Sequence, residues 1–236
     1  MLLRRELLVL LLIAVSSTPA FAHRDDYLEE TLVYETLERR EIEPEYWLDY
    51  GYDRGIHNHF FRHHGALEYG ITDRWMIDGR ATLRQSFGQA AQFESARVET
   101  RYRFRGEGSL PVDIAISAEV NTELSETGQR QYGFEPRLIL SKDIKKKLNL
   151  TLNLAEEIGL NRREYGFAPA AGFRYNASKL IGFGSEFKYE TDAHRGSITP
   201  QIWFKLGHGT TIKTGISIGV GPLRRTFGRV AFEKEF

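Results

Sequence analysis

Cysteine is absent from the 236 residues of this chain, which excludes disulfide bonds and a cysteine nucleophile. An excess of charge of one sign is absent as well, since 32 basic residues stand against 32 acidic ones. This balance argues against nucleic acid or an acidic surface as the main partner. After residue 22, no apolar run approaches the roughly 20 residues that a membrane-spanning helix needs. The fold must therefore be inferred from the pattern of the residues that are present.

The longest apolar run lies at the N-terminus and has the features of a secretory signal peptide. Arg4 and Arg5 precede the apolar residues 7–15, and small residues follow up to Ala20-Phe-Ala22. A basic region, a short apolar core and an A-x-A site are the marks of such a signal. The run is about half the length of a membrane anchor. We therefore expect residues 1–22 to be cleaved from an exported chain.

From about residue 42 onward, apolar and polar residues alternate with period two, which is the pattern of β-strands with one apolar face. In the segment 74–84, for example, Trp75, Ile77 and Leu83 share one face, whereas Arg80 lies on the other. Connectors separate the segments of this kind, which we place at 42–52, 59–71, 74–85, 93–104, 111–121, 132–141, 147–157, 164–175, 179–189, 197–206, 210–220 and 225–236.

These segments predict an all-β fold of about twelve strands. Most of them run roughly 10 to 12 residues, the length that a tilted strand needs to cross a bilayer, whereas strands of soluble proteins are nearer 5 or 6. Because only half of each such strand faces lipid, 12% aromatic residues are compatible with a negative mean hydropathy. We expect residues 42–236 to form a single transmembrane, antiparallel, up-and-down β-barrel. An even strand number places both of its ends on one side.

The last strand of the expected barrel ends on an aromatic residue. Counting back by twos from Phe236 gives Lys234, Phe232, Val230 and Gly228 on one face. This strand resembles the closing strand of bacterial outer-membrane β-barrels, in which the terminal aromatic and the apolar residues spaced by two are read by the barrel-assembly machinery. The resemblance implies that Val230, Phe232 and Phe236 form an assembly signal, with outer-membrane lipids around the barrel and both termini in the periplasm. Lys234 departs from the pattern, in which an apolar residue is usual.

A second resemblance lies in the segment Ala66-Leu-Glu-Tyr-Gly-Ile-Thr-Asp-Arg-Trp75, which reads as a strand, a Thr-Asp turn and the next strand. It is similar to a hairpin of outer-membrane transporter barrels, including the group linked with the degradation of phenol. The resemblance implies a transporter barrel and does not establish a cargo. We expect the barrel to be a monomer that carries no cofactor.

The polar faces of the strands are expected to line the barrel interior, because charge against lipid is very costly. Both signs occur on these faces, with a local excess of arginine: Arg62, Asp78, Arg80, Arg84, Arg97, Glu99, Arg101, Arg103, Glu119, Arg137 and Arg174. Such a lumen can conduct small polar solutes, and its arginines favour anions. Alternatively, opposite charges pair across the interior and seal it, since a twelve-stranded barrel lies between filled and open sizes. A channel or transporter is the leading hypothesis, and a closed structural barrel is an alternative.

Four histidines, His57, His59, His63 and His64, fall in the first expected outer loop and the strand after it. Imidazoles at this density are candidate ligands for zinc, copper or nickel. In an extended strand, however, His57, His59 and His63 share one side and His64 lies opposite. A surface barrel that binds metal is therefore a further hypothesis.

An enzyme that modifies envelope lipids is another alternative. The short His-x-Ser motif of outer-membrane phospholipases does not occur in the chain. Glu156 and Glu157 are neighbours in a strand, so their carboxylates point to opposite faces and do not form an acid–base pair. A soluble periplasmic β-sandwich would share the alternation of residues but not the length of the strands.

Residues 23–41 differ from the rest because they are highly charged and fit either a short amphipathic helix or a strand. We assign them as a periplasmic N-terminal segment. A free tail and a small plug of the lumen are the two forms that this segment can take.

Overall fold

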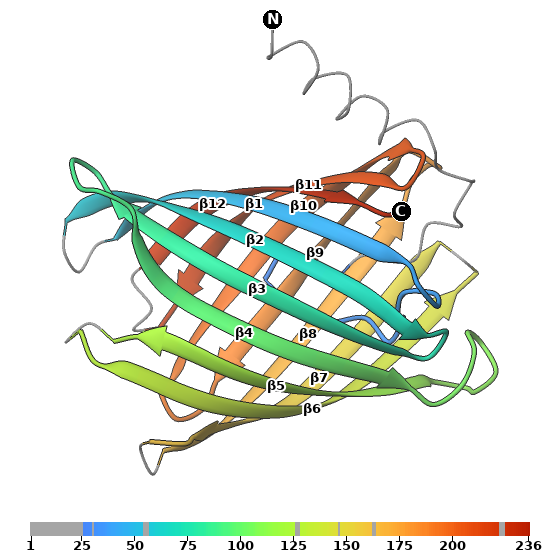
Figure 1. Ribbon diagram of the computed structural model, residues 1–236. Helices are drawn as coiled ribbons and strands as arrows, with labels where there is room; N and C mark the ends of the chain where they lie inside the picture. The colour runs from blue at the N-terminus through green and yellow to red at the C-terminus, as the bar shows by residue number, and fades with distance from the viewer. Residues whose placement is uncertain are drawn as a thin grey trace, which may run out of the picture.

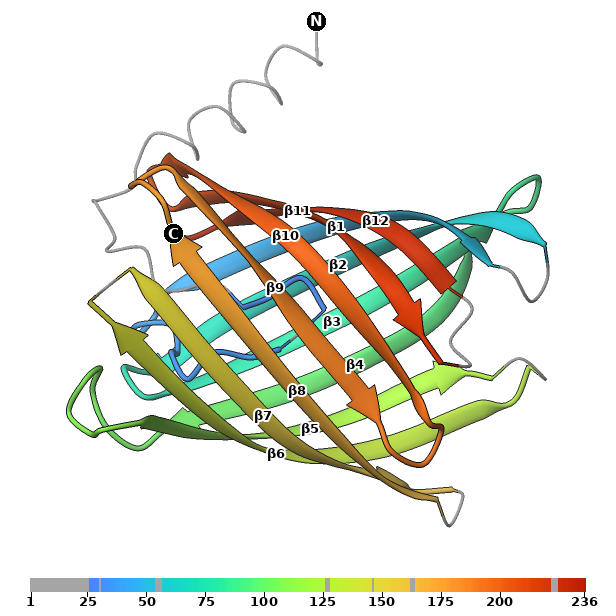
Figure 2. The same ribbon diagram turned by 180° about the vertical axis from the view of Figure 1, so that it is seen from behind.

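The computed structural model describes residues 26–29, 31–53, 57–125, 128–145, 147–161, 164–221 and 225–236. Twelve antiparallel strands form one closed barrel, in which each strand pairs with its sequence neighbours and β1 pairs with β12 (Figures 1 and 2). They are β1 (Ile42–Asp53), β2 (Asn58–Thr72), β3 (Trp75–Ser86), β4 (Gln92–Arg103), β5 (Asp113–Leu124), β6 (Arg130–Ile144), β7 (Leu148–Gly159), β8 (Tyr165–Asn176), β9 (Ile181–Glu190), β10 (Arg195–Gly207), β11 (Thr210–Val220) and β12 (Arg225–Lys234). The predicted antiparallel barrel of about twelve strands is confirmed. Within the described ranges, no helix is long and apolar enough to cross a membrane.

The two faces of the strands are as different as their sequences predict. On the outer surface, Leu67 is 55% exposed and Val98 is 53% exposed. On the inner surface, Asp49 and Lys213 are completely buried. Since side chains alternate between the faces of a strand, this separation gives an apolar exterior and a charged interior.

The barrel closes where β1 meets β12, in antiparallel register from Glu45 opposite Glu233 to Asp53 opposite Arg225. Past the end of β12, the N–H of Phe236 donates to the carbonyl of Ile42 at 2.9 Å, and the N–H of Ile42 donates back at 3.2 Å. We call this end of the barrel the terminal rim and the other end the loop rim.

Lys234, the exception to the apolar pattern of β12, lies at the terminal rim. Its ammonium group donates to the carbonyl of His208 in the turn between β10 and β11, and lies 5.0 Å from the centre of the Phe236 ring. A long side chain at a rim can keep its stem on the apolar surface while its charge reaches polar groups. The lysine is therefore accommodated without breaking the apolar belt.

The connectors at the loop rim are all short: 54–57, 87–91, 125–129, 160–164, 191–194 and 221–224. The longest connector of the barrel, 104–112 between β4 and β5, lies at the terminal rim. Little chain is therefore available at the loop rim to fold over the mouth of the barrel. Whether the lumen is open depends on what lies inside it.

Candidate functional site

The lumen of the barrel contains a segment of its own chain. The plug segment, which we define as residues 26–29 and 31–37, runs inside the barrel before β1 begins (Figure 2). Its side chains Tyr27, Leu28 and Leu37 are completely buried, and Leu32 is 2% exposed. This part of residues 23–41 therefore lies in the lumen and not free in the periplasm. Of the two forms expected for the segment, the structure shows the plug.

Three small clusters of apolar side chains hold the plug against the inner wall. Leu28 packs against Trp47 and Ala231, and Tyr27 and Val33 pack against Trp203. Leu32 and Tyr34 pack against Ala115 and Ile139. The rings of Tyr27 and Trp203 meet edge to face with their centres 5.6 Å apart, a preferred aromatic arrangement. The inner wall thus has apolar pockets that receive the apolar side chains of the plug.

A glycine provides the space for Tyr27. A Cβ atom at Gly172 on β8 would lie 2.7 Å from two atoms of the Tyr27 ring. On the other side of the plug, a Cβ at Gly215 on β11 would lie 2.8 Å from the Leu28 side chain. The plug and the wall are therefore closely fitted at both positions.

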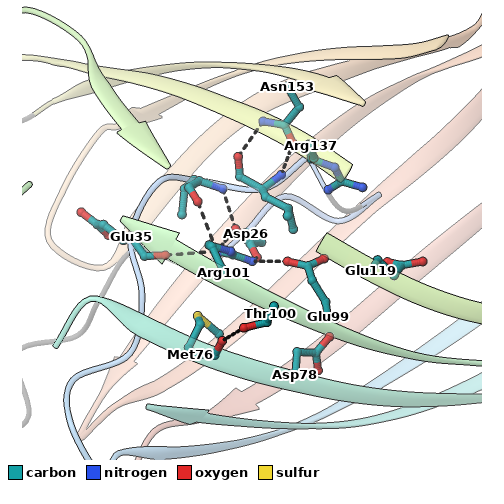
Figure 3. Close-up of polar contacts among 12 residues, drawn as sticks. Asp26, Glu35, Met76, Asp78, Glu99, Thr100, Arg101, Glu119, Arg137 and Asn153 are labelled. Carbon is teal, nitrogen blue, oxygen red and sulfur yellow. Dashed lines mark hydrogen bonds and ion pairs between the residues drawn. The ribbon is translucent and has the colours of Figure 1, made fainter. Parts of the chain in front are cut away.

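Arg101 on β4 is the centre of the polar contacts of the plug (Figure 3). Its guanidinium group binds both carboxylate oxygens of Asp26, at 2.5 and 3.1 Å. It also donates to the carbonyls of Val33 and Glu35, at 3.2 and 3.1 Å. Glu99 on the same strand lies 3.5 Å from it. A planar guanidinium with five donors suits such a set of acceptors. One side chain therefore binds Asp26 at the start of the plug and the backbone of Val33 and Glu35 near its end.

Uncharged and acidic side chains of the wall bind the backbone of the plug. The N–H of Leu32 donates to the Asn153 amide oxygen at 2.8 Å, and the Asn153 amide nitrogen donates to the Leu32 carbonyl at 2.9 Å. The N–H of Leu28 donates to Gln201 at 2.9 Å. The N–H groups of Glu29 and Thr31 donate to the two carboxylate oxygens of Glu186, at 2.5 and 3.2 Å. These contacts satisfy backbone groups that no strand partner satisfies.

Ion pairs fill much of the remaining interior. Arg229 binds the Asp49 carboxylate through two nitrogens, at 2.5 and 2.8 Å, and His64 lies 3.1 Å from the same carboxylate. Arg80 pairs with Glu45 at 2.6 Å, and Lys213 pairs with Glu233. The Arg80 guanidinium also lies 3.6 Å from the centre of the Trp47 ring. Each of these three cations therefore lies against a carboxylate of the inner wall.

Arginines gather on one side of the mouth at the loop rim. Arg84 lies 3.2 Å from the Asp53 carboxylate, and Arg225 lies 3.2 Å from the same carboxylate. Arg62 binds Glu94 at 2.7 Å. Three guanidinium groups therefore lie together with two carboxylates on β1–β4 and β12.

The other predicted lumen residues also lie on the inner wall. Arg97 bridges Asp78 at 3.3 Å and Glu119 at 3.2 Å, so these three form one network. Arg137 pairs with its strand neighbour Glu135. Next to this pair, a cavity of about 30 Å³ has room for roughly one water molecule.

Two further predicted residues have different surroundings. Arg174 is completely buried, with its guanidinium 5.3 Å from the centre of the Trp203 ring. Arg103 is half-buried at the terminal rim, where it donates to the carbonyl of Asp73 at 2.5 and 2.8 Å. Arg103 thus binds the β2–β3 turn and is remote from the arginines at the mouth.

The structure does not bring the four histidines together. His57, His59 and His63 lie along the outer surface of the β1–β2 hairpin, where each Nδ1 is bonded to a different tyrosine: Tyr52, Tyr50 and Tyr46, at 3.4, 3.0 and 2.7 Å. His64 lies in the lumen beside Asp49. Among the described residues, groups that could hold a metal contain only carboxylates. Three of the imidazoles are therefore hydrogen-bond partners of tyrosines, and the fourth lies on the other face of the strand.

We expect the double variant His57→Ala/His59→Ala to bind zinc as weakly as the parent protein. The physical reason is that the two rings are held by separate hydroxyl groups along β1 and offer no common coordination sphere. Isothermal titration with zinc in detergent would measure this. A tight zinc site in the parent that the double variant loses would show that the rings converge on a metal.

Sequence reasoning selected charged residues as lumen-lining and did not single out Asn153 or Gln201. The alternation of residues 148–154 puts Asn153 on the face of β7 opposite a row of leucines. An uncharged amide at the buried centre of a strand needs a hydrogen-bond partner. That requirement could have identified Asn153 as a binding residue, but it does not say which segment of the chain supplies the partner.

No family model and no curated protein sequence matches the chain. Solved structures do match. The KdgM porin has a TM-score of 0.64 at 11% identity, over 82% of this chain and 99% of the porin. The COG4313 outer membrane channel from Pseudomonas putida F1 also has a TM-score of 0.64, at 9% identity, over 90% of this chain and 100% of the channel. The NanC porin has a TM-score of 0.59 at 13% identity, over 79% of this chain and 98% of the porin. The chain thus has the barrel fold of these outer-membrane channels.

Proposed function

We propose that this chain is an outer-membrane channel for small polar or anionic solutes, whose lumen the plug segment closes in the observed state. The observation that carries the proposal is the way in which the lumen is closed. The strands bond to one another around the whole barrel, and the plug adds no strand to it. The plug is held by side chains of the inner wall, and these contacts can be exchanged for water or solute without breaking the sheet.

The apolar exterior supports a position within a lipid bilayer, because a belt of this size is not left in water. In this proposal, outer-membrane lipids surround a monomeric barrel and the terminal rim faces the periplasm. The barrel-assembly machinery reads the outward residues of β12, Val230 and Phe232, together with Phe236. Val230 is 52% exposed and Phe232 is 45% exposed, so both side chains are accessible on the outer surface.

We expect Phe236→Ala to lower the amount of assembled protein in the outer membrane of cells several-fold. The substitution removes the last aromatic of the proposed signal but leaves the backbone pairing with Ile42 intact. Phe173→Ala is a matched control, because both phenylalanines are 43% exposed on the same apolar surface. Immunoblots of fractionated membranes would measure the effect. Equal losses in the two variants would show that the position at the chain end has no special role.

The arginines at the loop rim support a preference for anions, since positive rings and clusters favour anions in pores. The KdgM porin is among the similar structures in a complex with oligogalacturonate. Because that ligand is an acidic sugar, acidic sugars are suitable test solutes for this chain.

In planar bilayers with a salt gradient, we expect the reversal potential to show a preference for chloride over potassium. Arg62→Gln/Arg84→Gln should move it toward potassium, because it removes two of the three guanidinium groups of this cluster while Asp53 and Glu94 remain. Arg103→Gln is the control, since Arg103 binds a turn at the other rim. A preference for potassium in the parent protein would contradict the proposed anion selectivity.

A closed structural barrel is the second candidate, and the ion pairs of the lumen favour it. They neutralise charge along the inner wall: Arg97 pairs with carboxylates on the two neighbouring strands, and Arg229 pairs with Asp49 on the adjacent β1. The two functions differ in one measurement. If neither the full-length protein nor a variant without the plug carries current above that of the empty membrane, the channel proposal is wrong.

A further inference from the structure

The wall of the lumen recognises the plug mainly as a peptide backbone. Side chains of the wall accept from four backbone N–H groups of the plug, those of Leu28, Glu29, Thr31 and Leu32. They also donate to five of its carbonyls, those of Asp26, Leu28, Leu32, Val33 and Glu35. Every peptide offers these groups, whatever its sequence. The contacts therefore define a chemical class of ligand and not only one segment.

The recognising side chains are buried, and two of them are hydrogen-bonded to each other. Asn153 and Glu186 are 1% exposed, and Gln201 is 3% exposed. The Gln201 amide nitrogen donates to Glu186 at 3.0 Å, which orients the Gln201 oxygen toward the N–H of Leu28. Groups that are positioned in advance bind a ligand with little loss of conformational entropy. The contact between Gln201 and Glu186 thus orients two of the wall groups toward the plug backbone.

Charged and apolar positions extend this match. Arg101 holds both oxygens of the Asp26 carboxylate, and a peptide C-terminus carries the same group. The pockets of Tyr27 and Leu28, which Gly172 and Gly215 keep open, suit an aromatic and an aliphatic side chain. A sugar offers neither a row of N–H donors nor these apolar side chains.

We infer that the lumen is a binding site for peptides, occupied in this structure by the chain's own plug, and that short peptides are among the solutes of the channel. This inference rests on the proposed function, and it names a substrate class for the same lumen. The inference implies a transport cycle in which a peptide replaces the plug in the lumen. The backbone of the peptide then makes the hydrogen bonds to the wall that the plug backbone makes in this structure.

The test is blockade of current by added peptides in planar bilayers. The protein is a variant without residues 26–37, whose barrel keeps all its strand pairs because the plug contributes none. Full-length Gly172→Val, in which the new side chain displaces Tyr27, is the second variant. Three probes are compared: the peptide of residues 26–35, an unrelated neutral peptide of equal length, and the first peptide N-methylated at the positions of Leu28, Glu29, Thr31 and Leu32.

We expect the first two peptides to block the current and the N-methylated one to need at least roughly a tenfold higher concentration, since it lacks four donors. Asn153→Leu should weaken blockade by both unmodified peptides about tenfold. Asn121→Leu is its control, because the Asn121 side chain donates to Glu119 at 2.8 Å and is not among the residues that bind the plug.

Two results would overturn the inference: blockade by the plug peptide without blockade by the unrelated peptide, or equal blockade by the N-methylated peptide. The first would show that the wall recognises only its own plug. If neither variant carries current, the proposed channel function is wrong, and the peptide site is still decided by Trp47 and Trp203 fluorescence on addition of the same three peptides. Quenching by all three alike, or by none, would then reject it.

Discussion

Deletion of residues 26–37 is expected to raise the single-channel conductance roughly tenfold or more, because the interior of a twelve-stranded barrel exceeds what its own side chains fill. In the observed state the plug occupies that space, with Tyr27, Leu28 and Leu37 completely buried inside the barrel. The connectors at the loop rim are too short to replace it. Recordings in planar bilayers would measure the change in conductance and in the fraction of time spent open.

A point substitution tests the same idea in the full-length chain. Gly172→Val puts a Cβ at 2.7 Å from the Tyr27 ring, so the ring must leave its place beside Trp203. Gly79→Val is a matched control, because a Cβ at Gly79 meets nothing within 4 Å. We expect a higher open fraction for Gly172→Val and an unchanged one for Gly79→Val. Equal conductance in the parent, the deletion and Gly172→Val would show that the plug does not control the lumen.

Replacement of Arg229 by methionine is expected to lower the free energy of unfolding by about 3–5 kcal/mol, the cost of leaving a buried charge without its partner. Asp49 is completely buried, and Arg229 contributes two of its hydrogen bonds, at 2.5 and 2.8 Å. Arg229 also donates to the Leu28 carbonyl of the plug. Urea unfolding in lipid vesicles, followed by tryptophan fluorescence, would measure the loss.

Two controls separate the buried charge from the loss of a side chain in general. Asp49→Leu/Arg229→Met removes both charges, and we expect it to recover much of the stability, since apolar replacements of buried pairs are often neutral. Arg195→Gln breaks the pair with Glu190, whose side chains are 46% and 31% exposed, and should cost only about 0–1 kcal/mol. A loss below about 1 kcal/mol for Arg229→Met would mean that water reaches Asp49 and that this part of the lumen is wet.

The barrel itself could be predicted because its determinants are local. Alternation with period two along 74–84 sends Trp75 outward and Arg80 inward wherever the strand lies in the sheet. The same rule placed His57, His59 and His63 on one side of the β1–β2 hairpin and His64 on the other, as the structure shows. It did not show that each outward ring is bonded to a different tyrosine, because that depends on the register between β1 and β2.

The plug could not be predicted in the same way. Its described residues, 26–29 and 31–37, form no helix or strand, so no periodic pattern indicates their conformation. Their partners lie far away in the sequence: Leu32 and Asn153 are 121 residues apart, and Leu28 and Gln201 are 173 apart. A charged segment with a few apolar residues is as compatible with a free periplasmic tail as with a plug of the lumen.

The sequence alone determined a barrel of about twelve strands, with one apolar and one charged face, because the period of each strand and the cost of charge against lipid are local properties. The tertiary structure decided whether that interior is empty. Closing the sheet brings Arg101, Asn153, Glu186 and Gln201 from four strands to one space. Only this convergence offers a chain segment enough hydrogen bonds to leave water and enter the lumen.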